Sequence, residues 1–283
     1  MKKTPHFWLK PSITLFVLAM ATWLSPVAPL DPWNLLSPQK IVKMVFALVL
    51  IQALGSMLGQ LMGRRAGALL TGFFGGLISS TATTASLARR SKVTNKTNNS
   101  SERLTFLAAT VAMLFEGLAM VVAGATEIHL QTLLIFIGPI LATVGMMFIQ
   151  YRRVENRHGS SEVSSFQILP LLKLSVFIIG ILTLSKVSQN LFGKSGLLVL
   201  TSFVSLFEIH GSIIANVHLH ESGAVNIHFL CSLLAVSVAA SYLSKLFLIS
   251  TIGSSFLRSY AIKSTLFLFV SLIISWLAAL SLA

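Results

Sequence analysis

The sequence is poor in acidic residues and in cysteine. Asp and Glu together number 8 among 283 residues, against 21 Lys and Arg, and Asp31 is the single aspartate. One aspartate excludes catalysis by a pair of aspartates on metal ions. One cysteine, Cys231, excludes a disulfide framework and a CxxC metal site. No phosphate-binding loop and no GxSxG nucleophile motif occurs. These absences argue against an enzyme, and they give no reason to expect a cofactor or a metal.

Charge of either sign is scarce as well. Charged residues make up 10% of the chain and hydrophobic residues 54%, with a mean hydropathy of +0.83, whereas soluble domains carry about 25% charged residues. Several apolar runs reach the roughly 20 residues that cross a bilayer as a helix. The sequence therefore predicts an all-α membrane bundle of about 7–9 hydrophobic segments. These segments are 12–28, 41–62, 67–89, 104–125, 130–150, 166–188, 196–217, 226–249 and 259–282.

The first apolar run follows three lysines within the first ten residues, as in a signal peptide. Pro29 directly after Ala28 disfavours cleavage. We expect an uncleaved anchor helix and its connection over 1–38, with a cytoplasmic N-terminus. The net charge of +13 could indicate nucleic acid. The basic residues instead flank apolar runs, where Lys and Arg mark the cytoplasmic face of a membrane, and we expect no nucleic-acid partner.

The segments repeat at an offset of 129 residues, which predicts two membrane repeats over 39–155 and 166–283. Segments 41–62, 67–89 and 130–150 map onto 170–191, 196–218 and 259–279, and 104–125 maps roughly onto 226–249. If every segment crosses, the loops on the two sides carry similar numbers of basic residues. If 67–89 and 196–217 return to their own side, the basic residues gather on the side of the N-terminus.

The second topology makes the halves inverted, with a broken or re-entrant segment in each, as in many secondary transporters. The alternative is that 67–89 is a long glycine-rich helix that spans the membrane and packs tightly.

The stretch 75–90, GGLISSTATTASLARR, is distinctive, and LDPW at 30–33 and GRRAG at 63–67 accompany it. Over roughly 30–282 the chain resembles a bacterial membrane domain of unknown function that commonly follows an MgtC/SapB domain. The resemblance implies a multi-pass protein of the bacterial cytoplasmic (inner) membrane and no established activity. The family's second motif is Gly-Leu-x-Asp-x-Asp-Ala. Here Glu208 keeps the first acid, His210 replaces the second, and Glu116 stands where the family has a base.

The 129-residue offset places Ser79 opposite Glu208 and Thr81 opposite His210. Together with Ser80 these residues are candidates for a central substrate or ion pathway, because hydroxyls and freed backbone groups at helix breaks can coordinate ions. The alternative is that the Ser and Thr hydroxyls simply join helices.

Glu116 and Lys245 occupy equivalent positions inside apolar segments, where a charge is costly without a partner. We expect a buried ion pair between them. The alternative is that Lys245 reaches the membrane interface and Glu116 is protonated. His218, His220, Glu221 and His228 could bind Zn²⁺ or Ni²⁺, although such a cluster is more often a wet loop, and we expect no metal site.

The leading functional prediction is a secondary transporter or permease of a small solute or ion. The alternative is a non-transporting membrane regulator. The resemblance suggests an MgtC/SapB-type partner for it, in magnesium or stress homeostasis. Both functions are compatible with a homo-oligomer in the bilayer.

The sidedness of the second segment separates the two topologies. In a Cys231→Ser background, single cysteines at Gly63 and Lys92 should both stay unlabelled by an impermeant maleimide until the cells are opened. Labelling of one site alone in intact cells would show that 67–89 spans the membrane.

Overall fold

The computed structural model describes residues 6–26, 39, 42, 46, 64–93, 100–154 and 193–282, and their regular secondary structure is helical throughout. The all-α prediction is confirmed for this part of the chain. The expected segments 41–62 and 166–188 lie outside the described residues, apart from two isolated positions.

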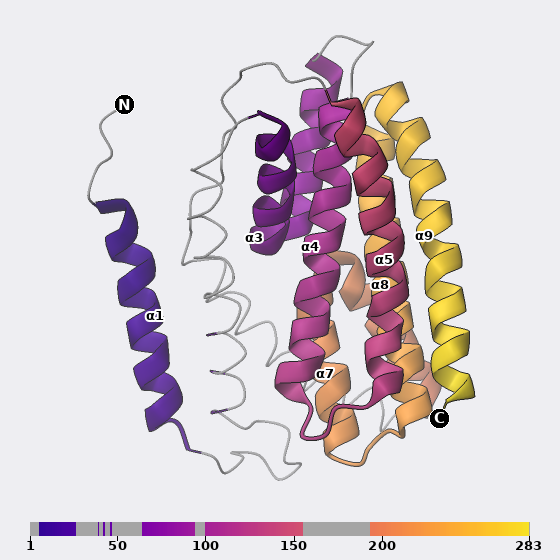
Figure 1. The fold of residues 1–283 in the computed structure, drawn as a ribbon. Coiled ribbons are helices and arrows are strands. Elements are labelled where there is room, and N and C mark those ends of the chain that lie inside the picture. The colour runs from indigo at the N-terminus through magenta and orange to yellow at the C-terminus, as the bar shows by residue number, and fades with distance from the viewer. Residues whose placement is uncertain are drawn as a thin grey trace.

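The N-terminal helix α1 comprises His6–Leu24 and stands beside the bundle in Figure 1. It begins and ends a few residues before the expected segment 12–28. Pro26 lacks an N–H group and disfavours helical geometry in the residue before it, which explains the early end. Large apolar side chains such as Phe16 and Trp23 are exposed on α1.

Four helices are long and apolar enough to cross a membrane. They match the expected segments 104–125, 130–150, 226–249 and 259–282 to within about a helical turn. These helices are α4 (Ser100–Gly124), α5 (Leu130–Arg153), α8 (Ile227–Ile252) and α9 (Ser255–Ser281). Most of α4 is enclosed by its neighbours, whereas α5 and α9 expose apolar side chains such as Leu141 and Leu266. An outward apolar face suits contact with lipid tails.

One end of the bundle is basic. Ser254, which caps α9, donates its backbone N–H to Ser91 Oγ at 2.9 Å. The Arg103 guanidinium lies 5.1 Å from the ring centre of Tyr260. These contacts bring together the start of α4, the start of α9 and the end of the preceding helix α3 (Arg64–Val93). The last turn of α5 adds two arginines at 152 and 153.

The opposite end carries histidines and acids. Thr126, just after α4, donates to the Glu221 carboxylate at the end of α7 (Ile209–Glu221). The rings of His129 and His220 stack edge to face at 5.7 Å. The two ends of the bundle therefore differ strongly in charge.

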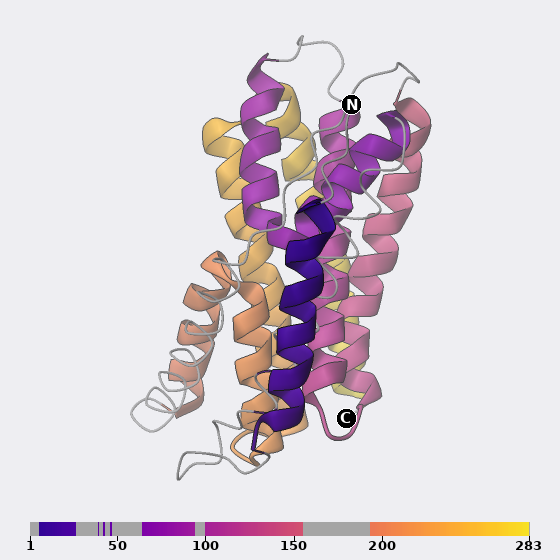
Figure 2. The ribbon, with the colours of Figure 1, turned by 90° about the vertical axis from the view of Figure 1, so that its left-hand side faces the viewer.

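Helix α3 forms a hairpin that returns to the basic end. Its backbone leaves helical geometry at Ser79, with φ −166° and ψ 104°. Ala68 in the first arm clusters with Leu104, and Leu87 in the second arm clusters with Leu257. Both partners lie at the basic end, and the two arms are visible in Figure 2.

A second hairpin enters from the opposite end. The helical segment Gly193–Phe207 runs to Glu208, which has φ −146° and ψ 100°, and α7 runs back. Leu197 clusters with Leu219, and Thr201 donates to Asn216 at 3.2 Å, so the two arms lie antiparallel. Figure 1 shows α3 in the upper half of the bundle and α7 in the lower half.

The first hairpin packs on α4 through glycine. A Cβ atom built on Gly76 would lie 2.7 Å from Ala109 Cα and 2.9 Å from Ala109 O. Both are backbone atoms of α4, which cannot move aside cheaply. A Cβ on Gly145 in α5 would meet nothing within 4 Å.

We therefore expect Gly76→Ala to lower the free energy of unfolding by about 1–3 kcal/mol, as overpacking does in protein cores. The matched change Gly145→Ala should be neutral or slightly stabilising. Thermal unfolding in detergent measures both. Equal melting temperatures for the two variants would show that the first hairpin does not pack on α4 in this way.

Candidate functional site

The two helix breaks occupy related positions and use the same local device. Ser79 and Glu208 lie 129 residues apart, which is the offset predicted from the sequence for the repeat of the apolar segments. Ser79 Oγ accepts from Ala82 N at 3.2 Å, and Glu208 Oε1 accepts from His210 N at 3.0 Å. Each side chain thus satisfies a free N–H group at the start of the arm that follows.

His210 lies between two carboxylates. Its Nδ1 is 3.0 Å from Glu208 Oε1, and its Nε2 is 3.1 Å from Glu116 Oε2 on α4. The side chain of Glu116 is 1% exposed, that of His210 10% and that of Glu208 29%. This acid–histidine–acid cluster therefore joins the tip of the second hairpin to the interior of α4.

The two contacts of His210 are not equivalent. The Nδ1 contact with Glu208 satisfies hydrogen-bond geometry, with the donor depending on the tautomer. Glu116 Oε2 and His210 Nε2 lie close together, but neither atom has a well-aligned hydrogen-bond partner. The Glu116–His210 contact does not depend on a precise hydrogen-bond direction, so it can break and form again when the hairpin or α4 shifts.

Lys245 does not form the expected ion pair with Glu116. Within the described residues, the ion pair of Glu116 is with His210, and Lys245 Nζ instead donates to Ser241 Oγ and Met113 Sδ, both at 2.8 Å. The break at Glu208 places His210 in the first turn of α7, facing α4, which explains why His210 reaches the carboxylate.

Lys245 nevertheless belongs to the same neighbourhood. Met113 lies three residues before Glu116, about one turn away on the same side of α4. Lys245 also interacts electrostatically with Glu208 and His210. Two acids and two bases in one buried region can balance their charges, which lowers the cost of burying each.

The expected five-residue pathway is only partly assembled. Glu208 and His210 come together, but no hydrogen bond between the two described hairpins joins them to Ser79, Ser80 or Thr81. Ser80 is buried, and its carbonyl accepts from Thr84 Oγ1 at 2.7 Å.

Both hairpin tips still pack on α4 on either side of Glu116. Leu77 of the first hairpin clusters with Ala112, and a Cβ atom on Gly117 would meet Ile213 of α7 at 2.9 Å. Glu116 therefore lies between the places where the two hairpins touch α4.

A second polar group was not predicted from the sequence. Ser237, Ser241 and Lys245 lie at four-residue intervals on α8, and all three are buried. Ser237 Oγ contacts Ser212 Oγ at 3.3 Å and Asn216 Nδ2 at 3.5 Å. The i, i+4 spacing of polar residues in an apolar helix is the signal that could have revealed this face.

The histidine-rich stretch lies at the end of the bundle opposite the basic one. His220 Nδ1 contacts the carbonyl of Val225 at 2.8 Å, and no three metal-binding side chains gather among the described residues.

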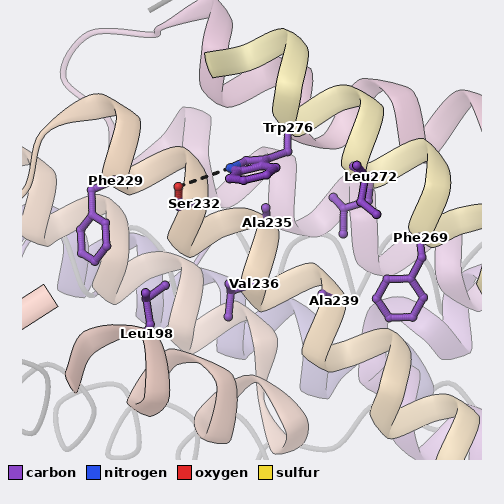
Figure 3. A pocket seen from close by; sticks show the side chains of 10 residues that line it. Leu198, Phe229, Ser232, Ala235, Val236, Ala239, Phe269, Leu272 and Trp276 are labelled. Carbon is purple, nitrogen blue, oxygen red and sulfur yellow. Dashed lines mark hydrogen bonds between the residues drawn. The ribbon is translucent and has the colours of Figure 1, made fainter. Parts of the chain in front are cut away.

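An apolar pocket of about 390 Å³ opens between the segment Gly193–Phe207, α8 and α9. Figure 3 shows its walls, including Leu198, Phe229 and Leu272, with Trp276 donating to Ser232 Oγ at 3.3 Å. This apolar lining has few groups that could form hydrogen bonds with a polar solute. The acid–histidine–acid cluster is therefore the stronger candidate site.

These features define a class of protein. In the described residues it is an all-helical chain with four helices that fit a membrane protein and two helices broken next to buried polar groups. The chain belongs to the family described as Domain of unknown function (DUF4010), whose model matches residues 47–253. The family resemblance seen in the sequence is confirmed, whereas the association with an MgtC/SapB protein stays a prediction. No curated protein and no solved structure matches the chain.

The Glu116–His210 contact predicts non-additive effects on stability. Glu116→Gln alone should destabilise the protein by about 1–3 kcal/mol, because the buried His210 loses one of its two carboxylates and keeps only Glu208. The double variant Glu116→Gln/His210→Gln should lose less than the sum of the two single variants.

Thermal unfolding in detergent measures this double-mutant cycle. Glu127→Gln, at an exposed glutamate, is the matched control and should have little effect. Strictly additive losses would show that Glu116 and His210 do not interact.

Proposed function

We propose that this protein is a secondary transporter of a small solute or ion in the bacterial cytoplasmic membrane. The observation that carries the proposal is the pair of broken hairpins, which enter from opposite ends and reach α4 on either side of the buried Glu116. Irregular backbone at membrane depth is tolerated where it is buried in protein or lines a cavity. Discontinuous helices in that setting build the binding sites of many transporters.

The distribution of charge supports the orientation. The turns at the basic end carry Arg103, Arg152, Arg153 and Arg258, whereas Lys194 lies at the opposite end against Phe229. Loops rich in Lys and Arg stay on the cytoplasmic side. The first hairpin then enters from the cytoplasm, the second from outside, and the N-terminus is cytoplasmic.

The order and direction of the helices support an inverted repeat. The 129-residue offset maps α4 onto 229–253 and α5 onto 259–282, within four residues of α8 and α9. Helix α4 leaves the basic end and α8 arrives there, while α5 arrives and α9 leaves. The segments 41–62 and 170–191 would open the two halves. Such halves can exchange conformations, which is a basis of alternating access.

The chemistry of the cluster suits coupling to protons. An imidazole between two carboxylates can take up or release a proton, and the change in its charge alters how strongly it attracts each acid. Its non-directional contact with Glu116 allows the hairpin tip to separate from α4 when the charge changes. The Ser and Thr hydroxyls of the first hairpin, Ser79 to Thr81, would contribute to binding a small anion or polar solute.

Flux into liposomes tests the proposal. The purified protein would be reconstituted with a pH-sensitive dye inside, and chloride, sulfate, phosphate and glycine would be added in separate experiments. We expect at least one of them to move protons, and we expect Glu208→Gln to reduce that flux roughly tenfold or more. Glu127→Gln should retain the flux.

Two outcomes would contradict this function. Flux unchanged by Glu208→Gln would remove the acid–histidine–acid cluster from the mechanism. Liposomes inert to every solute, together with a stable membrane partner recovered in mild detergent, would favour the regulator, with an MgtC/SapB-type protein as the expected partner.

A further inference from the structure

A buried cluster of neutral polar side chains fills the space between the arms of the second hairpin and α8. Its members come from three helical elements, and none carries a charge. They are Thr201 and Ser205 in the first arm, Ser212 and Asn216 in α7, and Ser237 in α8. Each is 5% exposed or less. So many polar groups in an apolar bundle are costly unless they are satisfied or bind something.

The hydrogen bonds of the cluster use up most of its donors. Ser237 Oγ donates to the carbonyl of Leu233 at 2.9 Å, so Ser212 donates in the Ser212–Ser237 contact. Thr201 Oγ1 donates to Asn216 Oδ1, and Asn216 Nδ2 donates to Ser237 Oγ. The lone pairs of Thr201, Ser212 and Asn216 are left over, so the cluster offers mainly acceptors.

Ser205 adds a hydroxyl that has no hydrogen-bond partner among the described residues, although Ser205 is only 2% exposed. The register of the hairpin shows where it faces. Leu197 packs on Leu219 and Thr201 bonds to Asn216. The next residue on that face, Ser205, therefore lies opposite Ser212.

Comparison with the first hairpin shows that a hairpin can pack against its neighbouring long helix without such polar side chains. The 129-residue offset places Gly72, Gly76 and Ala108 at the positions equivalent to Thr201, Ser205 and Ser237. A Cβ atom on Gly72 would lie 2.8 Å from Ala108 Cβ. The first hairpin therefore packs directly on α4, with only small side chains at the contact. The equivalent positions in the second half carry Thr201, Ser205 and Ser237, whose side chains bring hydroxyl oxygen atoms to this junction.

We propose that this cluster binds a monovalent cation of the size of Na⁺, which acts as a second coupling ion beside the proton. The proposal deepens the transporter function and rests on it for the role of the ion, but not for its binding. The Thr201–Asn216 and Ser212–Ser237 oxygen pairs are 3.2 and 3.3 Å apart, longer than the usual 2.7–2.8 Å of O–H···O bonds. A cation bound to oxygen at about 2.4 Å separates neighbouring ligand oxygens in an octahedron by roughly 3.4 Å.

The surroundings favour a single positive charge. The first arm ends at Phe207, so its last carbonyl groups and the negative end of its helix dipole point toward the break, while the Glu208 carboxylate caps the opposing positive end of α7. The five side chains include no carboxylate, so they would compensate a divalent ion poorly. The acids of the neighbouring cluster already face His210.

Binding of ²²Na⁺ to the purified protein tests the proposal without requiring transport. We expect saturable binding that excess unlabelled Na⁺ displaces and that choline does not. Ser205→Ala should weaken it roughly tenfold or more, because a buried cation depends on each ligand oxygen to replace its hydration shell.

The Ser205→Ala variant distinguishes a cation-binding role of Ser205 from a packing role. The Ser205 hydroxyl has no hydrogen-bond partner among the described residues. If Ser205 has only a packing role, Ser205→Ala should therefore keep or raise the melting temperature and leave Na⁺ binding unchanged. Ser264→Ala is the matched control, because Ser264 is also buried but lies on α9 and bonds to the carbonyl of Tyr260. It should bind ²²Na⁺ as the parent protein does.

Each outcome decides the proposal. No saturable ²²Na⁺ binding, or equal binding by the parent and Ser205→Ala, would overturn it. Binding that Ser205→Ala weakens, in liposomes that move no solute, would support the cation site and count against transport. Solute flux that is independent of Na⁺, from protein that binds no ²²Na⁺, would support transport and overturn the cation site.

Discussion

The interaction on which the arrangement depends is the attachment of the second hairpin to α4 through His210. The backbone breaks at Glu208, whose carboxylate caps α7 and at the same time contacts the His210 ring. The other side of the ring faces Glu116. One histidine thus links the broken backbone to α4, the most buried of the four long apolar helices. Without such a link, a break in apolar surroundings would leave polar groups exposed to lipid.

The two hairpins solve the same structural problem with different chemistry. At the first, a neutral serine caps the second arm, and glycines let that hairpin lie directly on α4. At the second, an acid is the cap, and polar side chains separate the first arm from α8. If the halves derive from a duplication, the first has kept a role in close packing and the second has acquired ionisable groups.

Much of this architecture follows from the sequence because two signals are strong. Long apolar runs give the four long helices, and the two segments expected to be broken leave helical geometry at Ser79 and Glu208. The partner of Glu116 could not be predicted in the same way. The 129-residue offset predicted Lys245 as the partner of Glu116. The actual contact depends on the direction in which the break at Glu208 turns the His210 side chain. The polar face of α8 was missed because serine is too common in apolar helices to draw attention.

The positions of the hairpins on α4 have an electrical consequence. The tip of the first hairpin meets α4 at Ala112 and the second hairpin meets it at Glu116. Four residues of helix separate these points, which is about 6 Å, against a hydrocarbon core of roughly 30 Å. If water follows each hairpin inward, most of the membrane voltage drops across this short stretch. Charges at Glu116 and His210 would then lie where the electric field is strongest. A small displacement of either charge would cross a large fraction of the membrane voltage.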